Sequence, residues 1–149
     1  MKKFQFNLST LLQVRNEALN AAHRDLQEAH IHLKNMLKKI EELEREYILL
    51  TEDIQRKQKE KFFASELADQ HDYLIRLELR IKLQVEEVVK AQINVEDRRL
   101  LIVQAMQRKK TIENLRDKQY TAWETKAIIA EAVFFDEVSS IYHRRRSRQ

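Results

Sequence analysis

Apolar residues recur in alternating steps of three and four through the first third of the chain. Such a heptad spacing predicts a long helix with one coiled-coil seam, and its length predicts a left-handed supercoil with a second helix. The seam positions of this first arm are Leu8, Leu12, Arg15, Leu19, Ala22, Leu26, Ala29, Leu33, Met36, Ile40, Leu43, Tyr47, Leu50 and Ile54. Only Arg15 interrupts the seam.

The pattern lapses after Ile54 into a polar run over residues 55–61, followed by Phe62, Phe63 and Ala64. Ser65 can cap a second helix, so the chain is predicted to turn at about residues 58–65. The turn contains no glycine, which leaves a single bent helix as the alternative.

A second arm resumes the seam after the turn and then loses it. Its positions are Leu67, Gln70, Leu74, Leu77, Ile81, Gln84, Val88, Ala91, Val95, Arg98, Ile102 and Ala105. The next five, which hold only two apolar residues, are Lys109, Ile112, Arg116, Gln119 and Trp123. If Ile54 faces Leu67, antiparallel pairing places Leu8 opposite about Glu113, so the seam fades where the first arm runs out.

The prediction is therefore an all-α fold, an antiparallel two-helix coiled-coil hairpin with unequal arms, forming a single domain over residues 1–149. We expect helix 1 at about 7–58, helix 2 at about 66–142 and a basic tail at 143–149. At 1.5 Å per residue, the second arm extends about 45 Å beyond its partner.

The predicted overhang carries apolar residues that have no partner helix. They are Trp123, Ala127, Ile128, Ile129, Ala130, Val133, Phe134, Phe135, Val138 and Ile141. Apolar surface of this kind marks an interaction site. The alternatives are that Phe4 and Phe6, or a second copy of the chain, cover it.

Composition supports the long-helix interpretation. The 149 residues include no glycine and no proline, which a sheet protein needs for its many turns. Hydrophobic residues make up 43% of the chain, and their regular spacing argues against disorder. Cysteine is absent, which excludes disulfides and thiolate metal sites and is compatible with a cytosolic location. No apolar run suits a signal peptide or membrane insertion.

The net charge of +4 resides in the C-terminal tail, which holds Arg144, Arg145, Arg146 and Arg148. Such a tail can bind nucleic acid or anionic lipid. We favour a solvated helix end whose cations complement the helix dipole, because basic residues and aromatics form no shared face elsewhere. The prediction is no nucleic-acid partner.

Catalytic chemistry is not predicted. A two-stranded coiled coil has a core one side chain thick and offers no substrate pocket. His30 and His32 lie on different sides of a helix, and His23 and His30 are two turns apart, so neither pair is spaced to chelate a metal. A phosphate-binding loop needs glycine. We therefore expect no enzyme activity, no cofactor and no metal.

Both ends of the chain resemble the FliJ family of flagellar export proteins. Residues 4–15 follow the pattern F-x-F-x-L-x-x-L-L-x-x-R of its N-terminal signature. Arg116, Trp123 and the pair Asp136-Glu137 resemble its closing pattern of an arginine-rich stretch, a tryptophan and a late Asp-Glu pair. Phe135 stands before that pair where the family usually has Leu or Met.

The resemblance implies a non-enzymatic stalk of the bacterial flagellar type III export apparatus. Its partners would be the hexameric export ATPase FliI, the export gate protein FlhA and export chaperones. Its location would be the cytoplasm, peripherally associated with the inner membrane at the flagellar base.

The resemblance also implies roles for individual residues. The ATPase-facing end would comprise Phe4, Phe6, Leu8, Leu12, Arg15, Arg116, Trp123, Phe134, Asp136 and Glu137. The gate-facing residues would be Tyr47, Tyr73 and Leu77, although Tyr47 and Leu77 lie on the seam and are better explained as core.

Two other functions remain open from the sequence. One is the equivalent stalk of a virulence injectisome. The other is a generic structural coiled coil that forms a homodimer through the stripe at residues 123–141.

Overall fold

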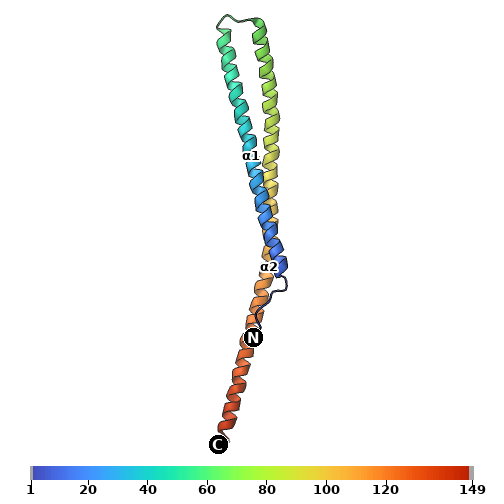
Figure 1. The fold of residues 1–149 in the computed structure, drawn as a ribbon, viewed down its shortest axis with the longest axis vertical. Helices are drawn as coiled ribbons and strands as arrows, with labels where there is room; N and C mark the ends of the chain where they lie inside the picture. Colours follow the sequence, from blue (N-terminus) through green and yellow to red (C-terminus); the bar gives the residue numbers. More distant parts are fainter. Residues whose placement is uncertain (1, 148–149) are drawn as a thin grey trace. The chain divides into compact units, whose positions relative to one another are not determined.

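The computed structural model describes residues 2–147, which form two long helices (Figure 1). Helix α1 spans Ser9–Gln58 and helix α2 spans Ala64–Arg146. They pack against each other, which confirms the predicted all-α hairpin. By internal contacts the chain divides into unit 1, the residues up to Leu19 with those from Gln104 onward, and unit 2, Asn20–Val103.

Unit 2 contains the buried core, and the core occupies the predicted seam. Of the described residues, those with buried side chains are Ala29, Met36, Ile54, Leu77, Val88, Ala91, Val95 and Ile102. Each is a predicted seam position. The heptad pattern thus identified the residues that hold α1 against α2, because only a 3.5-residue repeat keeps one stripe facing a supercoiled partner.

Contacts between the helices of unit 2 fix an antiparallel register. Gln70 Nε2 donates to Asp53 at 3.0 Å, and Gln84 Nε2 donates to the Met36 carbonyl at 3.2 Å. Farther from the turn, Arg98 lies 3.6 Å from Asp25. These pairings match the predicted register of Ile54 facing Leu67.

The turn closes without any residue at positive φ in the described chain, which explains how it forms without glycine. The N–H groups of Lys59 and Glu60 each donate to the carbonyl three residues back, which tightens the end of α1. The Phe63 carbonyl accepts from Glu66 at 3.1 Å and from Leu67 at 3.3 Å. Phe63 therefore caps α2, and Ser65, the predicted cap, lies inside the first turn.

The outer helix ends differ slightly from the predicted ones. Helix α1 begins at Ser9, and the Leu8 carbonyl accepts from the Leu12 N–H at 2.9 Å. Helix α2 continues through Arg146, so the first four residues of the predicted tail are helical. Basic residues in the last turn complement the negative end of the helix dipole. Residues 148 and 149 of the predicted tail lie outside the described residues.

Two tyrosine–glutamate hydrogen bonds cross between the helices near the turn. Tyr47 of α1 donates to Glu78 of α2 at 3.0 Å, and Tyr73 of α2 donates to Glu46 of α1. The hydrogen bond and the negative charge of Glu78 raise the pKa of Tyr47 above its ordinary value of 10.0. The hydrogen bond to Glu46, with burial and the carboxylate charge, raises the pKa of Tyr73 likewise.

These raised pKa values predict a loss of stability in alkali. A tyrosine whose pKa is higher in the folded chain than in the unfolded chain stabilises the folded chain. This stabilisation is complete at pH values below the unfolded-state pKa and is lost as the pH rises through the folded-state pKa. We expect the free energy of unfolding to fall above about pH 10. The variant Tyr47→Phe/Tyr73→Phe should show a shallower fall in urea titrations, whereas Tyr142→Phe, at an exposed tyrosine, should keep the wild-type slope. An equal slope in all three proteins would contradict the assignment.

Candidate partner-binding surfaces

An aromatic cluster in unit 1 ties the segment before α1 to α2. The Phe4 ring lies edge-on to Tyr120, with 5.3 Å between ring centroids, and 5.9 Å from the Trp123 ring. Tyr120 and Trp123 are themselves 5.8 Å apart. Aromatic pairs at these separations stabilise a contact beyond the area they bury. The N-terminal segment therefore covers α2 as far as Trp123.

This contact revises the predicted overhang. The pairing of the two helices predicted that the overhang of α2 begins at about Glu113. In the structure, residues 4–8 lie along α2 beyond that point, although they are not helical. Phe4 and Phe6 are both half-buried. The alternative in which Phe4 covers the stripe thus applies to Trp123, the first residue of the stripe.

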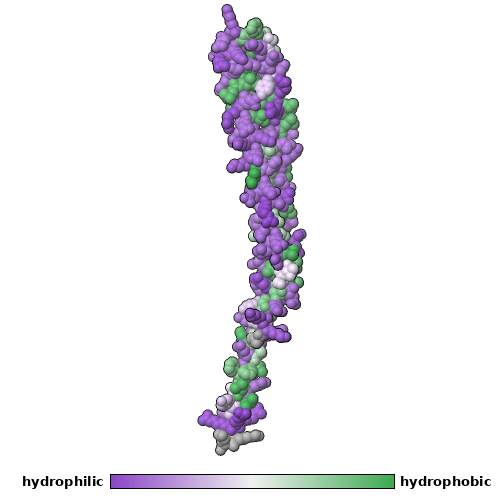
Figure 2. All heavy atoms as spheres, viewed as in Figure 1, coloured by the Kyte–Doolittle hydropathy of each residue, from purple (hydrophilic) through white to green (hydrophobic). Residues whose placement is uncertain are grey.

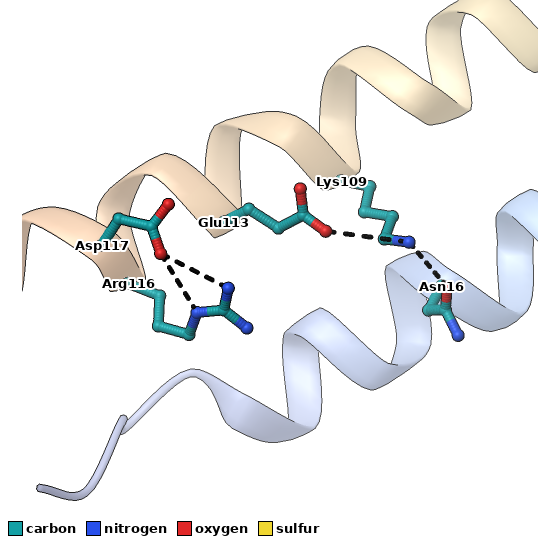
Figure 3. Close-up of polar contacts among 5 residues, drawn as sticks. All are labelled: Asn16, Lys109, Glu113, Arg116 and Asp117. Carbon is teal, nitrogen blue, oxygen red and sulfur yellow. Dashed lines mark hydrogen bonds and ion pairs between the residues drawn. The ribbon is translucent and has the colours of Figure 1, made fainter. Parts of the chain in front are cut away.

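Unit 1 also contains polar contacts on α2 and between α1 and α2 (Figure 3). Lys109 of α2 donates to Asn16 of α1 at 2.9 Å and also lies 3.7 Å from Glu113. Arg116 is paired with the neighbouring Asp117 at 3.3 Å and is exposed. Exposed pairs of this kind add little stability, so Arg116 remains available to a partner.

Arg15 is the one charged residue on the seam of α1. Its side chain is half-buried, and its Nε atom is buried without a hydrogen-bond partner among the described residues. A buried donor without a partner costs about 1–3 kcal/mol. Arg15 therefore destabilises unit 1. A leucine at this seam position would not carry this cost.

Beyond the aromatic cluster, α2 presents apolar side chains to solvent. Every described residue from Ile128 to Ser147 is exposed, including Asp136 and Glu137. The side chains with the largest exposed fractions are Ile128 at 62%, Phe134 at 61%, Phe135 at 65% and Tyr142 at 77%. Figure 2 shows a group of hydrophobic residues, drawn in green, near the C-terminal end of α2. We call residues 128–142 the distal apolar surface.

The gate-facing residues suggested by the sequence lie in unit 2. Tyr47 and Tyr73 are half-buried and engaged in the hydrogen bonds to glutamate described above. Leu77 is the most deeply buried large side chain, at 1% exposure, and belongs to the core. A surface contact through Leu77 would require the helices to separate.

Several open grooves lie on the surface of the described residues. One open groove of about 740 Å³ lies between the helices of unit 2, and its lining is dominated by charged residues of both signs. Within residues 2–147, no three His, Asp or Glu side chains come close enough to hold a metal ion. Neither described helix has a stretch long and apolar enough to cross a membrane.

The structure brings together some of the predicted site residues and leaves others apart. Phe4 contacts Trp123, and Leu8, Leu12 and Arg15 are half-buried in the same unit. Phe134, Asp136 and Glu137 stand exposed on the distal part of α2. Sequence reasoning missed Tyr120, which lies off the seam. Its spacing of three from Trp123, on one helix face, was the available signal.

Comparison with known proteins bears on this arrangement. No curated protein and no solved structure matched the chain. A family described as flagellar FliJ protein matched residues 4–148, which include the aromatic cluster, the whole hairpin and the distal apolar surface. The chain therefore belongs to the FliJ family of flagellar proteins.

Proposed function

We propose that this chain is a non-enzymatic stalk of the bacterial flagellar protein export apparatus. In this role its ATPase-facing end binds the hexameric export ATPase FliI and promotes its assembly. Its other contacts would be with the export gate protein FlhA and export chaperones. Membership of the FliJ family supports a place in flagellar export, and the finer roles rest on the surfaces described above.

The observation that carries the proposal is the distal apolar surface. Residues 128–142 expose large apolar side chains that no other described part of the chain covers. Water-exposed apolar surface of this extent is costly to keep unless a partner buries it. Helical apolar faces of this kind bind grooves or pores of partner proteins through anchors spaced along one side.

The aromatic cluster supports the same end of the chain as the binding site. Phe4 holds the N-terminal segment against Tyr120 and Trp123, so residues from both ends of the sequence lie in one unit. A partner that binds unit 1 can therefore contact the N-terminal and C-terminal motifs together. Arg116, Asp136 and Glu137 add exposed charge for specificity around an apolar centre.

A stalk can act without catalysing a reaction. Inside a ring of six subunits, one asymmetric chain makes different contacts with each subunit. Its binding free energy then favours some subunit arrangements over others, which shifts the population of the ring. For the gate end we propose Tyr47 and Tyr73, whose side chains are partly accessible in unit 2, rather than Leu77.

The test is a paired substitution on the distal apolar surface. Phe134→Asp/Phe135→Asp should weaken binding to the purified export ATPase by about 30-fold, as expected for loss of a central aromatic anchor. Stimulation of ATP hydrolysis should fall accordingly. The matched control is Phe63→Asp, at a phenylalanine that is 76% exposed beside the turn of unit 2. Unchanged stimulation by the double variant, or an equal loss in the control, would refute the proposed site.

The location follows from the proposed function. We propose that the chain works in the cytoplasm, peripherally associated with the inner membrane at the base of the flagellum. Co-sedimentation of the chain with membranes that carry the export gate, and not with membranes lacking it, is the expected result.

A further inference from the structure

Helix α2 carries a second apolar stripe in unit 2, on a face that α1 does not cover. Its apolar members occupy positions of one heptad register, with a step of four between the first two, a step of four between the last two, and a step of ten between these pairs. They and their exposed fractions are Ile75 at 63%, Leu79 at 57%, Val89 at 47% and Ile93 at 56%. Leu83 at 52% and Val85 at 45% flank the middle of the stripe. We call residues 75–93 of this face the outer stripe.

The outer stripe has the pattern of a helix–helix interface, interrupted at its centre by two charges. Between Leu79 and Val89, the positions that continue the heptad are Lys82 and Glu86, both exposed. A helix face that met only solvent would not need apolar residues in one heptad register on both sides of these charges. The two opposite charges restrict which helix can pack there.

We propose that the outer stripe binds the outer stripe of a second copy of this chain, with the two α2 helices antiparallel. The two-fold axis lies at the level of residue 84 along α2, on the face opposite the Gln84 side chain, which contacts Met36 of α1. In this register Ile75 faces Ile93 of the second copy, and Leu79 faces Val89. Lys82 then faces Glu86. Because the axis repeats each contact, the interface has four apolar layers and two complementary charge pairs.

Charge selects this arrangement over the parallel one. Parallel pairing in register would place Lys82 beside Lys82 and Glu86 beside Glu86 of the second copy, and like charges in an interface are costly. Antiparallel pairing around this axis converts the same four charges into two attractive pairs. The stripe is therefore complementary to itself, as an isologous two-fold interface requires.

The residues beside the axis complete the interface. In an antiparallel coiled coil, flanking positions meet their own equivalents across the axis. Leu83 would meet Leu83 of the second copy on one side, and Val85 would meet Val85 on the other. Both are exposed in the single chain, so pairing would shield the central charges from water.

Sedimentation of the full chain tests the pairing. The interface involves the 19 residues 75–93 of one helix per copy, so we expect a reversible dimer within roughly 1–100 micromolar protein. Lys82→Glu places Glu beside Glu86 and should raise the dissociation constant by about tenfold or more. Glu86→Lys should do the same, and the double variant Lys82→Glu/Glu86→Lys should restore the dimer. Far-ultraviolet circular dichroism checks that each variant remains helical.

The apolar layers have a matched control. Leu79→Asp should abolish the dimer, whereas Leu49→Asp should leave it intact, because Leu49 is 64% exposed on α1 and lies outside the stripe. A chain that remains monomeric over this range, or single charge variants that dimerise as well as wild type, would overturn the proposal. So would a dimer that survives Leu79→Asp and is lost on Phe134→Asp.

A cross-link tests the position of the axis. The chain has no cysteine, so Val85→Cys can form a disulfide only between two copies. Under mild oxidation we expect rapid disulfide dimers of Val85→Cys and slow ones of Leu49→Cys. Equal rates would place the axis elsewhere and contradict the register. The outer stripe lies in unit 2, and the proposed ATPase site lies in unit 1, so failure of one proposal leaves the other standing.

Discussion

Replacement of Leu77 by alanine should lower the free energy of unfolding by about 3 kcal/mol, the largest loss we expect from one truncation in this chain. Leu77 is 1% exposed and sits on the seam of α2. A two-stranded core has one layer of side chains, so neighbouring residues cannot collapse into the space from several directions. The cost therefore includes the lost burial of the side chain and the cavity left behind.

Urea titration followed by circular dichroism measures this loss. Leu49→Ala is the control, because Leu49 is the same residue type on the partner helix at 64% exposure. The control should change stability by less than about 0.5 kcal/mol. A small effect of Leu77→Ala would mean that the two helices are not held together at this position.

Replacement of Arg15 by leucine should stabilise the chain, in contrast to Leu77→Ala, and raise the free energy of unfolding by about 1–2 kcal/mol. The substitution removes a buried Nε donor that has no partner among the described residues and continues the leucine seam. Because Arg15 is among the residues proposed to meet the ATPase, stimulation of ATP hydrolysis should fall in the same variant. Gain of stability with loss of function is the signature of a residue kept for binding.

Arg24→Leu is the matched control for Arg15→Leu. Arg24 is exposed on the same helix and lies off the seam, so both stability and stimulation should stay near wild type. If Arg15→Leu were destabilising, its guanidinium would have to be satisfied in the folded chain. If it stabilised the chain and left stimulation intact, Arg15 would have no part in the ATPase contact.

The hairpin could be predicted from the sequence because one physical pattern determines it. A 3.5-residue repeat specifies which side chains face the partner, and Ala29, Met36 and Val95 are buried where the repeat placed them. The turn was less predictable. Ser65 is a good cap in isolation, but the structure caps α2 with the Phe63 carbonyl, which needs no side-chain oxygen, and the helix begins at Ala64.

The candidate site could be predicted only in part. Motifs pointed to Phe4 and Trp123, but periodicity cannot show that a non-helical segment lies along a helix, so their contact was only one of the alternatives that the sequence left open. Tyr120 was missed because it lies off the seam. The outer stripe does not stand out in the sequence because its charges at Lys82 and Glu86 dilute the apolar signal.

The register of the hairpin also has a kinetic consequence. Asp53 and Gln70 are 17 residues apart, whereas Asn16 and Lys109 are 93 apart. Closing a long loop costs more entropy than closing a short one. Contacts that form first near the turn shorten the loop that the later contacts must close. The chain should therefore fold as a zipper from the turn outward, with rapid hydrogen exchange in residues 9–19 and slow exchange around Leu77. The segment proposed to enter the ATPase would then be the last to close and the first to open.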